Sequence, residues 1–420
     1  MNQISFLGAL GTVGASGILV DTGIEKILLD HGTKIREVPP KFPIPIQGKP
    51  DAILLSHCHL DHSGGISLFH ANGQGCPIYS IDVTKPLTEL LLLDSLKISH
   101  EEGISLPFTK KDVQETIKSF VTIPYRQKFK IRKTTFTFFD AGHVPGSAMV
   151  LLNLGDKNLL YTGDLKTTDT RLLEKADEDL PRVDHLIIES TYADREHADR
   201  KSQEKELVRI INETLAVDGH CLLAGFAIGR LQEILLILDK YGIDYQIFMD
   251  GMAKKATTII NQHNNLLKEP GSLDRALKKV QYVSSDKTRN KVLKHPSVIL
   301  TTSGMLTGGP VVRYLKKLYS DRKSSLVLTG WQLEDTPGRV LLETGRYITK
   351  GLDLEVKMFV KRLDFSAHLG RKELFEFVEK LNPKKIFCIH GDHTEEFASE
   401  LRGKGFDAVA PIANNRIFQI

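Results

Sequence analysis

The feature that most constrains this chain is a cluster of metal-ligand side chains directly after an apolar run. Residues 52–55 (Ala-Ile-Leu-Leu) predict a buried strand, and His-Cys-His-Leu-Asp-His follows at 57–62. Imidazole and carboxylate groups are the usual zinc ligands of catalytic sites, where one position stays open to solvent. Residues this close in sequence cannot all bind one ion, but a single loop could serve two adjacent ions. The alternative interpretation is a polar turn after a strand.

Two later segments add side chains of the same chemistry. Asp-Ala-Gly-His-Val-Pro-Gly-Ser at 140–147 places His143 after a predicted strand, and Tyr-Thr-Gly-Asp at 161–164 places Asp164 at the end of another. Taken alone, each segment could be a strand-terminating turn. Their occurrence in order after the first motif favours a shared metal site.

The pattern of elements changes twice along the chain. The first part reads as short strands separated by glycine and polar turns, with strands expected at 17–20, 26–29, 52–55, 135–139, 150–154 and 158–162. From 193 to 345, strands alternate with helices of 10 to 15 residues, which predicts a parallel sheet. A strand pattern returns with 355–360 and 385–389. We therefore predict an α/β chain with a first segment at 1–192, an inserted domain at 193–345 and a returning segment at 346–420.

Composition limits the class of protein. With 420 residues, 41% hydrophobic and 26% charged, the chain is typical of a globular protein of one to three domains. No apolar run reaches about 18 residues, so no membrane span is expected. The four cysteines show no C-x-x-C spacing, which favours a reducing, cytoplasmic location. A net charge of +4 permits a polyanionic partner without requiring one.

These motifs resemble those of the metallo-β-lactamase superfamily, and further motifs resemble its β-CASP branch, which includes the cleavage-and-polyadenylation nucleases and ribonuclease J. The branch motifs are Glu-Ser-Thr-Tyr at 189–192, Phe-Ser-Ala-His at 365–368 and Cys-Ile-His-Gly at 388–391, with further matches at 225–230, 302–309 and 329–332. The resemblance covers nearly the whole chain. It implies an αβ/βα metallo-β-lactamase sandwich with an inserted parallel-sheet β-CASP domain.

The resemblance also implies a site with two Zn²⁺ ions per chain. One ion would be held by His57, His59 and His143, the other by Asp61, His62 and His390, with Asp164 bridging both. Asp30 would orient the histidine loop from behind the ligands. The alternative for Asp30 is a structural turn.

The catalytic side chains implied by the resemblance are the ligands Asp61 and Asp164 together with His368 and Glu189. His368 would act as general acid, or would stabilise charge on the leaving oxygen, while Glu189 orients it. Alternatively, His368 is a packed core histidine.

Contacts to RNA phosphates are also implied by the resemblance. They would come from Ser366, Arg230, Ser303 and Gly304. The alternative is that the glycines of the 302–309 segment merely form turns. A histidine at His390 is similar to the RNA-directed members of the branch, whereas DNA-directed members tend to carry valine.

The sequence therefore predicts a zinc-dependent ribonuclease that hydrolyses single-stranded RNA to leave 5′-phosphates, as a 5′–3′ exonuclease, an endonuclease or both, in RNA processing or decay. Two alternatives stay open: a non-catalytic RNA-binding or scaffold subunit of a 3′-end cleavage complex, and a DNA nuclease. Because relatives in this branch often dimerise, the resemblance also implies a homodimer.

Overall fold

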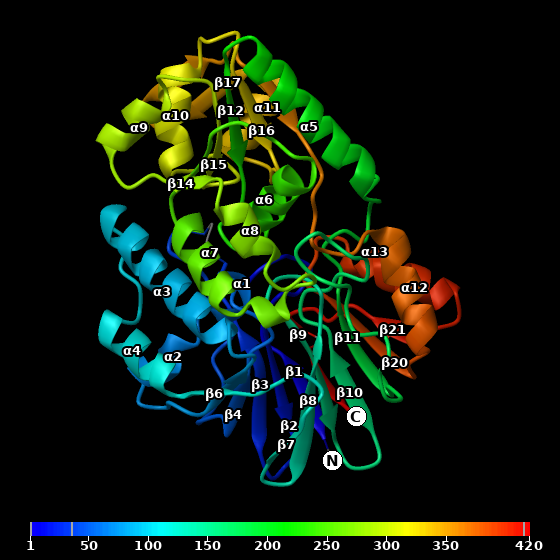
Figure 1. Cartoon of the computed structure of the whole chain (residues 1–420). Helices are drawn as coiled ribbons and strands as arrows, with labels where there is room; N and C mark the ends of the chain where they lie inside the picture. The colour runs from blue at the N-terminus through cyan, green and yellow to red at the C-terminus, as the bar shows by residue number, and fades with distance from the viewer. Residues whose placement is uncertain (1, 35–36, 415) are drawn as a thin grey trace. The chain divides into compact units, whose positions relative to one another are not determined.

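The computed structural model describes residues 2–34, 37–414 and 416–420, and the chain forms two compact units. The first unit comprises Met1–Asp169, Lys175–Glu196 and His368–Ile420, and the second comprises Thr170–Glu174 and His197–Ala367. The first unit is thus discontinuous in sequence, as a chain with an inserted domain requires (Figure 1).

The first unit contains two seven-stranded sheets. One sheet has the order β22-β1-β2-β3-β4-β5-β6 and the other β21-β20-β11-β10-β9-β8-β7. The strands are β1 (Gln3–Phe6), β2 (Gly17–Asp21), β3 (Lys26–His31), β4 (Ala52–Leu54), β5 (Ile78–Ser80), β6 (Phe120–Thr122), β7 (Lys128–Ile131), β8 (Thr134–Asp140), β9 (Ala148–Asn153), β10 (Asn158–Tyr161), β11 (His185–Glu189), β20 (Lys385–Ile389), β21 (Ala408–Val409) and β22 (Ile417–Gln419).

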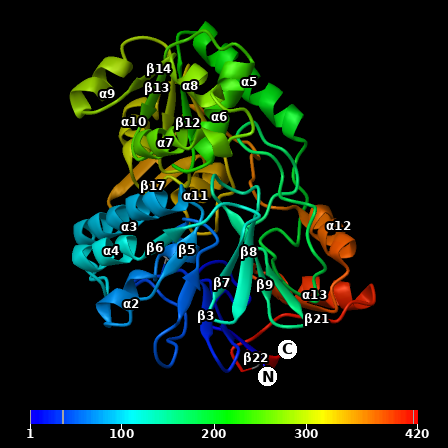
Figure 2. The same ribbon diagram turned by 60° about the horizontal axis from the view of Figure 1, so that its bottom comes forward.

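Helices cover the outer faces of both sheets. Helices α2 (Ser67–Ala71), α3 (Thr84–Glu101) and α4 (Lys110–Lys118) lie beside the first sheet, and α12 (Arg371–Leu381) and α13 (Thr394–Gly403) lie beside the second (Figure 2). The short helix α1 (Leu60–Ser63) contacts β3 of the first sheet. Each sheet is therefore covered on both faces, and central strands such as β11 are buried at every residue. This is an αβ/βα sandwich.

The direction of the strands places several chain turns at one edge of the second sheet. Strands β10, β11 and β20 are parallel neighbours, and β8 runs in the same direction because two antiparallel pairings separate it from β10. The carboxyl ends of all four strands therefore lie at the same edge. Residues just beyond these ends include the predicted His143, Asp164 and His390.

The second unit is built on a six-stranded parallel sheet of order β14-β13-β15-β12-β16-β19. Its strands are β12 (His220–Ala224), β13 (Ile247–Asp250), β14 (Val280–Tyr282), β15 (Ser297–Thr301), β16 (Ser325–Leu328) and β19 (Phe359–Arg362), with β17 (Arg346–Thr349) and β18 (Leu352–Glu355) in a separate hairpin. Its helices are α5 (Arg200–Ala216), α6 (Arg230–Lys240), α7 (Ala253–Gln262), α8 (Ser272–Leu277), α9 (Asp286–Val292), α10 (Pro310–Leu318) and α11 (Pro337–Thr344), with a 3₁₀ turn at Asn264–Leu266.

One part of the sequence interpretation is corrected. A single strand at 355–360 was expected to open the returning segment, but these residues span the end of β18, a connection and the start of β19. Both strands lie in the second unit, which extends to Ala367, whereas the segment boundary at residue 345 stays a prediction. The physical reason is that β19 pairs with β16 and completes the parallel sheet of the insert. The hydrophobic pattern within β19 does not reveal a pairing with a strand so distant in sequence.

No helix among the described residues is long and apolar enough to cross a membrane.

Candidate metal centre

The predicted metal-ligand side chains converge at the edge of the first unit's sheets. His57, His59, Asp61 and His62 come from the turn after β4 and from the short helix α1. The other three follow strands of the second sheet: His143 after β8, Asp164 after β10 and His390 after β20. Two groups of side chains with metal-ligand spacing result, and Asp164 belongs to both.

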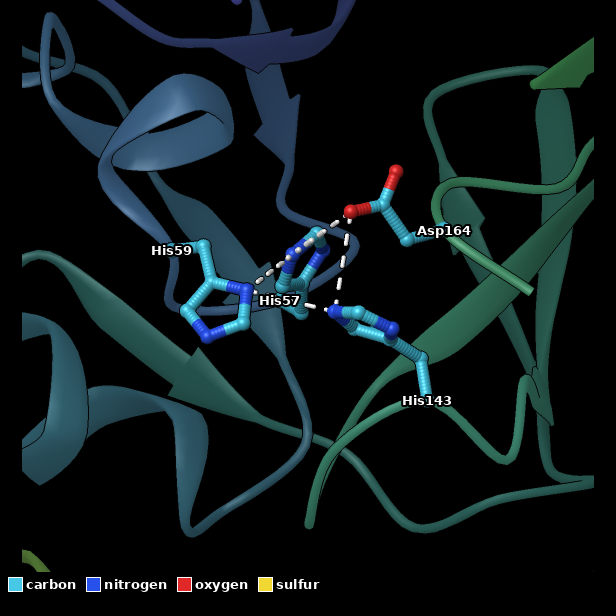
Figure 3. Close-up of side chains that lie close together, drawn as sticks. All are labelled: His57, His59, His143 and Asp164. Atoms are coloured by element: carbon cyan, nitrogen blue, oxygen red, sulfur yellow. Dashed lines mark hydrogen bonds and ion pairs between the residues drawn. The ribbon is translucent and has the colours of Figure 1, made fainter. Parts of the chain in front are cut away.

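The first group is His57, His59, His143 and Asp164, whose ligand atoms point toward a common centre (Figure 3). Nδ1 of His59 lies 3.2 Å from Nε2 of His57 and 3.2 Å from Nε2 of His143. Oδ2 of Asp164 lies 3.5 Å and 3.6 Å from the same two Nε2 atoms. Tetrahedral zinc with bonds of about 2.0–2.1 Å needs ligand atoms about 3.3–3.4 Å apart. The observed spacing fits.

The second group is Asp61, His62, Asp164 and His390. Oδ1 of Asp164 lies 3.2 Å from Nε2 of His62 and 3.7 Å from Nε2 of His390, and Oδ2 of Asp61 lies 3.6 Å from Nε2 of His390. Asp164 therefore turns one carboxylate oxygen toward each group. This is the arrangement that a bridging carboxylate requires.

Three candidate ligand atoms of the second group make no hydrogen bond that meets distance and angle criteria within the described residues. Nε2 of His62, Oδ1 of Asp164 and Nε2 of His390 are buried and lack a hydrogen-bond partner within the described parts of the chain. A buried polar atom without a partner costs free energy, so native proteins rarely leave one unsatisfied. Three such atoms facing one another fit a bound cation.

The histidines are oriented from behind by a hydrogen-bond network. Nδ1 of His62 lies 2.7 Å from Oδ2 of Asp30, which also accepts hydrogen bonds from the Tyr161 and Ser56 hydroxyls, each at 2.7 Å. Nδ1 of His390 lies 2.8 Å from the Ser16 hydroxyl. A carboxylate that accepts from Nδ1–H leaves the Nε2 lone pair free for a metal.

The electrostatics of the site favour neutral histidines and the binding of a metal cation. Burial lowers the pKa of His57, His59 and His390, so their imidazoles stay in the neutral form that ligates metals. His62 behaves differently: burial opposes its protonation, but Asp164 and Asp61 raise its pKa well above the usual value. The raised pKa reflects the negative charge that converges on this point.

His368 and Glu189 form a pair beside the first group. Nδ1 of His368 lies 3.0 Å from Oε2 of Glu189, and its ring centroid lies 4.5 Å from that of His143. Burial lowers the pKa of His368, but the Glu189 and Asp164 carboxylates outweigh it and raise the pKa to about 8. The His368 side chain is 20% exposed, whereas Glu189 is almost fully buried. The two carboxylates thus favour the protonated form of His368, whose ring reaches solvent next to the candidate ligand cluster.

Sequence reasoning missed Lys166, which supports His368. The Lys166 amine donates to the carbonyl oxygen of His368 at 3.1 Å and to Glu373 at 3.0 Å. Glu373 in turn accepts the Gly370 N–H at 2.8 Å, at the start of α12. Lys166 lies two residues after Asp164, but its partners are about 200 residues away in sequence, so only the fold reveals its contacts.

The predicted phosphate-binding residues lie in the second unit. Arg230 donates to the carbonyl oxygen of Thr329, and the Ser303 hydroxyl lies 3.2 Å from that of Thr307. A Cβ on Gly304 would lie 3.1 Å from the carbonyl carbon of Gly225, so the loops after β12 and β15 approach backbone to backbone. These residues gather at the carboxyl edge of the parallel sheet. Ser366 is buried after β19, and its N–H donates to Asp364.

Comparison with known families matches most of the chain. The "Metallo-beta-lactamase superfamily domain" matches residues 13–185, the "Beta-Casp domain" residues 231–341, and the "Zn-dependent metallo-hydrolase RNA specificity domain" residues 353–411. Fold and site together define a metallo-hydrolase. The chain belongs to the metallo-β-lactamase superfamily, in its β-CASP branch. The α/β fold class and the family resemblance are thereby confirmed.

Several known proteins are similar over nearly the whole chain. "Probable RNase MJ4" of Methanocaldococcus jannaschii is 38% identical, over 99% of both chains. "RNase aCSPSF2" of Saccharolobus solfataricus is 32% identical over 94% of this chain and 80% of its own. The "Transcription termination factor FttA" of M. jannaschii is 35% identical over 95% of this chain and 69% of its own. A crystal structure of an Enterococcus faecalis protein of unknown function shares the fold, with a TM-score of 0.67, 16% identity and full coverage of both chains.

Proposed function

We propose that this chain is a ribonuclease that uses two zinc ions to hydrolyse phosphodiester bonds of single-stranded RNA, leaving 5′-phosphates, as a 5′–3′ exonuclease, an endonuclease or both. The observation that carries the proposal is the pair of four-atom donor sets that share Asp164. Relatives named as RNases, similar over 94% or more of this chain, support the substrate class.

The ligand sets assign a function to each side chain. His57, His59 and His143 would hold one zinc, Asp61, His62 and His390 the other, and Asp164 would hold both. Zinc in such a site supplies a nucleophilic water at neutral pH and neutralises charge on phosphoryl oxygens. Asp30 would keep the Nε2 lone pair of His62 available by accepting a hydrogen bond from Nδ1–H.

His368 would donate a proton to the leaving group. Because Glu189 accepts at Nδ1, the proton would be donated from Nε2 of His368. Hydrolysis breaks the bond between phosphorus and the 3′ oxygen, and a proton from His368 converts that oxygen to a hydroxyl. Water supplies the new oxygen on phosphorus, so the products are a 3′-hydroxyl and a 5′-phosphate.

His390 favours RNA over DNA in this proposal, because the residue is histidine where DNA-directed members tend to carry valine. The relatives named as termination factors are similar in sequence to this chain, but this chain spans 69% of the first of them. We therefore propose the ribonuclease activity itself and not a part in termination. Homodimerisation is a further prediction, and light scattering would test it by giving twice the 47.0 kDa chain mass.

The experiment that tests the function is digestion of a 5′-labelled single-stranded RNA by zinc-loaded wild type, His57→Ala and His390→Ala. Each substrate carries either a 5′-monophosphate or a 5′-hydroxyl, and a matched DNA is digested in parallel. The surface variant His100→Ala is the control, because His100 is exposed in α3. Zinc per chain is measured on every sample.

We expect about two zinc ions on wild type and cleavage of RNA that both ligand variants lose and His100→Ala keeps. Early release of labelled mononucleotide would identify a 5′–3′ exonuclease, and labelled fragments of intermediate length an endonuclease. Equal cleavage by wild type and ligand variants would refute the proposal. Binding of RNA without cleavage by the zinc-loaded wild type would instead support a scaffold, and faster cleavage of the DNA would support a DNA nuclease.

A further inference from the structure

The second unit carries an aromatic and cationic surface that the proposed chemistry does not use. Its centre is Trp331, the only tryptophan of the chain, which lies in the loop after β16 and is partly exposed. Its neighbour is Arg362, the last residue of β19. Because β16 pairs with β19, with Leu328 opposite Arg362, the two residues emerge from adjacent strands at one edge of the sheet.

Arg362 stacks on the tryptophan. Its guanidinium carbon lies 4.7 Å from the centroid of the Trp331 ring, which is a cation–π arrangement. A shallow hollow of about 200 Å³ opens beside the pair and is also lined by Gln332, Arg339 and Glu343. The stack therefore borders an accessible concavity.

The charge of Arg362 is not neutralised within the described residues, in which no carboxylate pairs with it. The neighbouring Arg339, in contrast, is paired with Glu343 of its own helix. An unneutralised guanidinium that lies over a ring keeps N–H groups available for an anion. The surface is thus complementary to an anionic ligand with a flat, apolar part.

A second aromatic ring extends this surface. Phe226, in the loop after β12, is 43% exposed. A Cβ placed on Gly330 would lie 3.7 Å from the Phe226 ring and 3.9 Å from the Arg230 guanidinium, so both side chains flank the residue before Trp331. Trp331, Arg362, Phe226 and Arg230 together are called the Trp331 platform below.

We propose that the Trp331 platform is a nucleobase-stacking site for single-stranded RNA, with a base stacked on the Trp331–Arg362 pair and the adjoining phosphate paired with Arg362. Bases of single strands stack on aromatic rings and on guanidinium planes, whereas bases inside a duplex are already stacked on one another. The inference rests on the proposed function for the identity of its ligand. It adds a base-binding contact on the insert, separate from the metal-ligand residues.

The test uses the fluorescence of Trp331, which reports on this site alone because the chain has one tryptophan. The full-length, zinc-loaded chain carries His368→Ala to slow cleavage, and a gel verifies that the RNA stays intact. The probes are a 12-nucleotide RNA and the same oligomer with abasic residues, which keeps the phosphates and lacks the bases. Affinity is measured independently by anisotropy of the labelled oligomers.

Four further substitutions are made in this chain. Trp331→Ala removes the stack, Trp331→Phe preserves a ring, and Arg362→Gln removes the charge. Tyr245→Ala is the matched control, because Tyr245 is another exposed aromatic residue of the same unit, at 40% exposure. Circular dichroism melts verify that each variant folds. If Trp331→Ala fails to fold, Trp331→Phe keeps the test valid.

The RNA is expected to quench Trp331 fluorescence with the dissociation constant that anisotropy gives, and the abasic oligomer to leave it unchanged. Trp331→Ala should weaken RNA binding about tenfold, and Trp331→Phe should restore most of that loss. Equal quenching by the abasic oligomer, or binding by Trp331→Ala equal to that of Tyr245→Ala, would overturn the stacking site alone. Absence of RNA binding in every chain would overturn both this inference and the proposed function.

Discussion

At the scale of single residues, Asp164 organises the site. Its two oxygens face two different groups of candidate ligand atoms, so this one side chain belongs to both candidate metal positions. The backbone of His390 is also unusual, with a φ of 54°. Left-handed backbone is uncommon for residues other than glycine, and such positions concentrate at functional sites.

Asp30→Asn is expected to lower zinc affinity without removing a ligand. An amide can accept from the Nδ1–H of His62, but it lacks the charge that strengthens the Nε2 lone pair. We expect a loss of about 10- to 100-fold in affinity, measured by competition with a chelator of known affinity. Tyr161→Phe, which removes only one of the hydrogen bonds to Asp30, should have a smaller effect. Unchanged affinity in Asp30→Asn would contradict this orienting function.

Lys166→Met is expected to lower kcat while leaving KM and zinc content unchanged. The amine holds the backbone of His368 and the carboxylate of Glu373, so its loss lets the imidazole shift. A misplaced catalytic group can cost up to about 100-fold in rate. Lys175→Met, on an exposed side chain, is the control. A parallel fall in zinc content would show instead that Lys166 supports the metal cluster.

At the scale of elements, both units place polar residues in the loops at the carboxyl ends of parallel strands. In the second unit, the end of β13 also carries a structural contact, because the buried Asp250 accepts hydrogen bonds from Arg289 of α9 at 2.7 Å and from Tyr314 of α10 at 3.0 Å. This carboxylate connects two helices to the sheet.

Asp250→Ala is expected to destabilise the second unit by about 3 kcal/mol, because it leaves Arg289 without its buried partner. Tyr314→Phe removes a single hydrogen bond and should cost about 1 kcal/mol. Urea unfolding monitored by Trp331 fluorescence measures both, since the only tryptophan lies in this unit. A larger loss in Tyr314→Phe than in Asp250→Ala would contradict this account.

At the scale of the whole molecule, the chain forms two units with separate hydrophobic cores. All candidate zinc ligands belong to the first unit, and Trp331 belongs to the second. A ligand that binds only one unit should therefore stabilise the two unequally.

Chelation of zinc is expected to lower the stability of the first unit more than that of the second. Binding to the folded state at 100 times the dissociation constant adds about 2.7 kcal/mol. Hydrogen exchange of residues 57–62 should accelerate after chelation, while exchange of β12 and β15 changes less. Equal acceleration in both units would contradict this expectation.

The sequence by itself determined the local chemistry of the protein. Candidate ligand residues could be predicted because they follow strands within a few positions, in the motif at 57–62 and in the turns bearing His143, Asp164 and His390. The α/β class and the presence of an inserted parallel-sheet domain are readable because hydrophobic periodicity and element order are local properties.

Only the tertiary structure decided what depends on distant pairing. Strand β19 pairs with β16 of the insert. Tyr161 donates a hydrogen bond to Asp30, 131 positions away, and Lys166 contacts His368. Each of these contacts joins residues far apart in the chain. The two Asp164 oxygens face different groups of candidate ligands, which only the atomic positions show. Sequence spacing limits which residues can meet, whereas the packing of the two sheets brings the candidate ligand atoms within 4.8 Å of one another in each group.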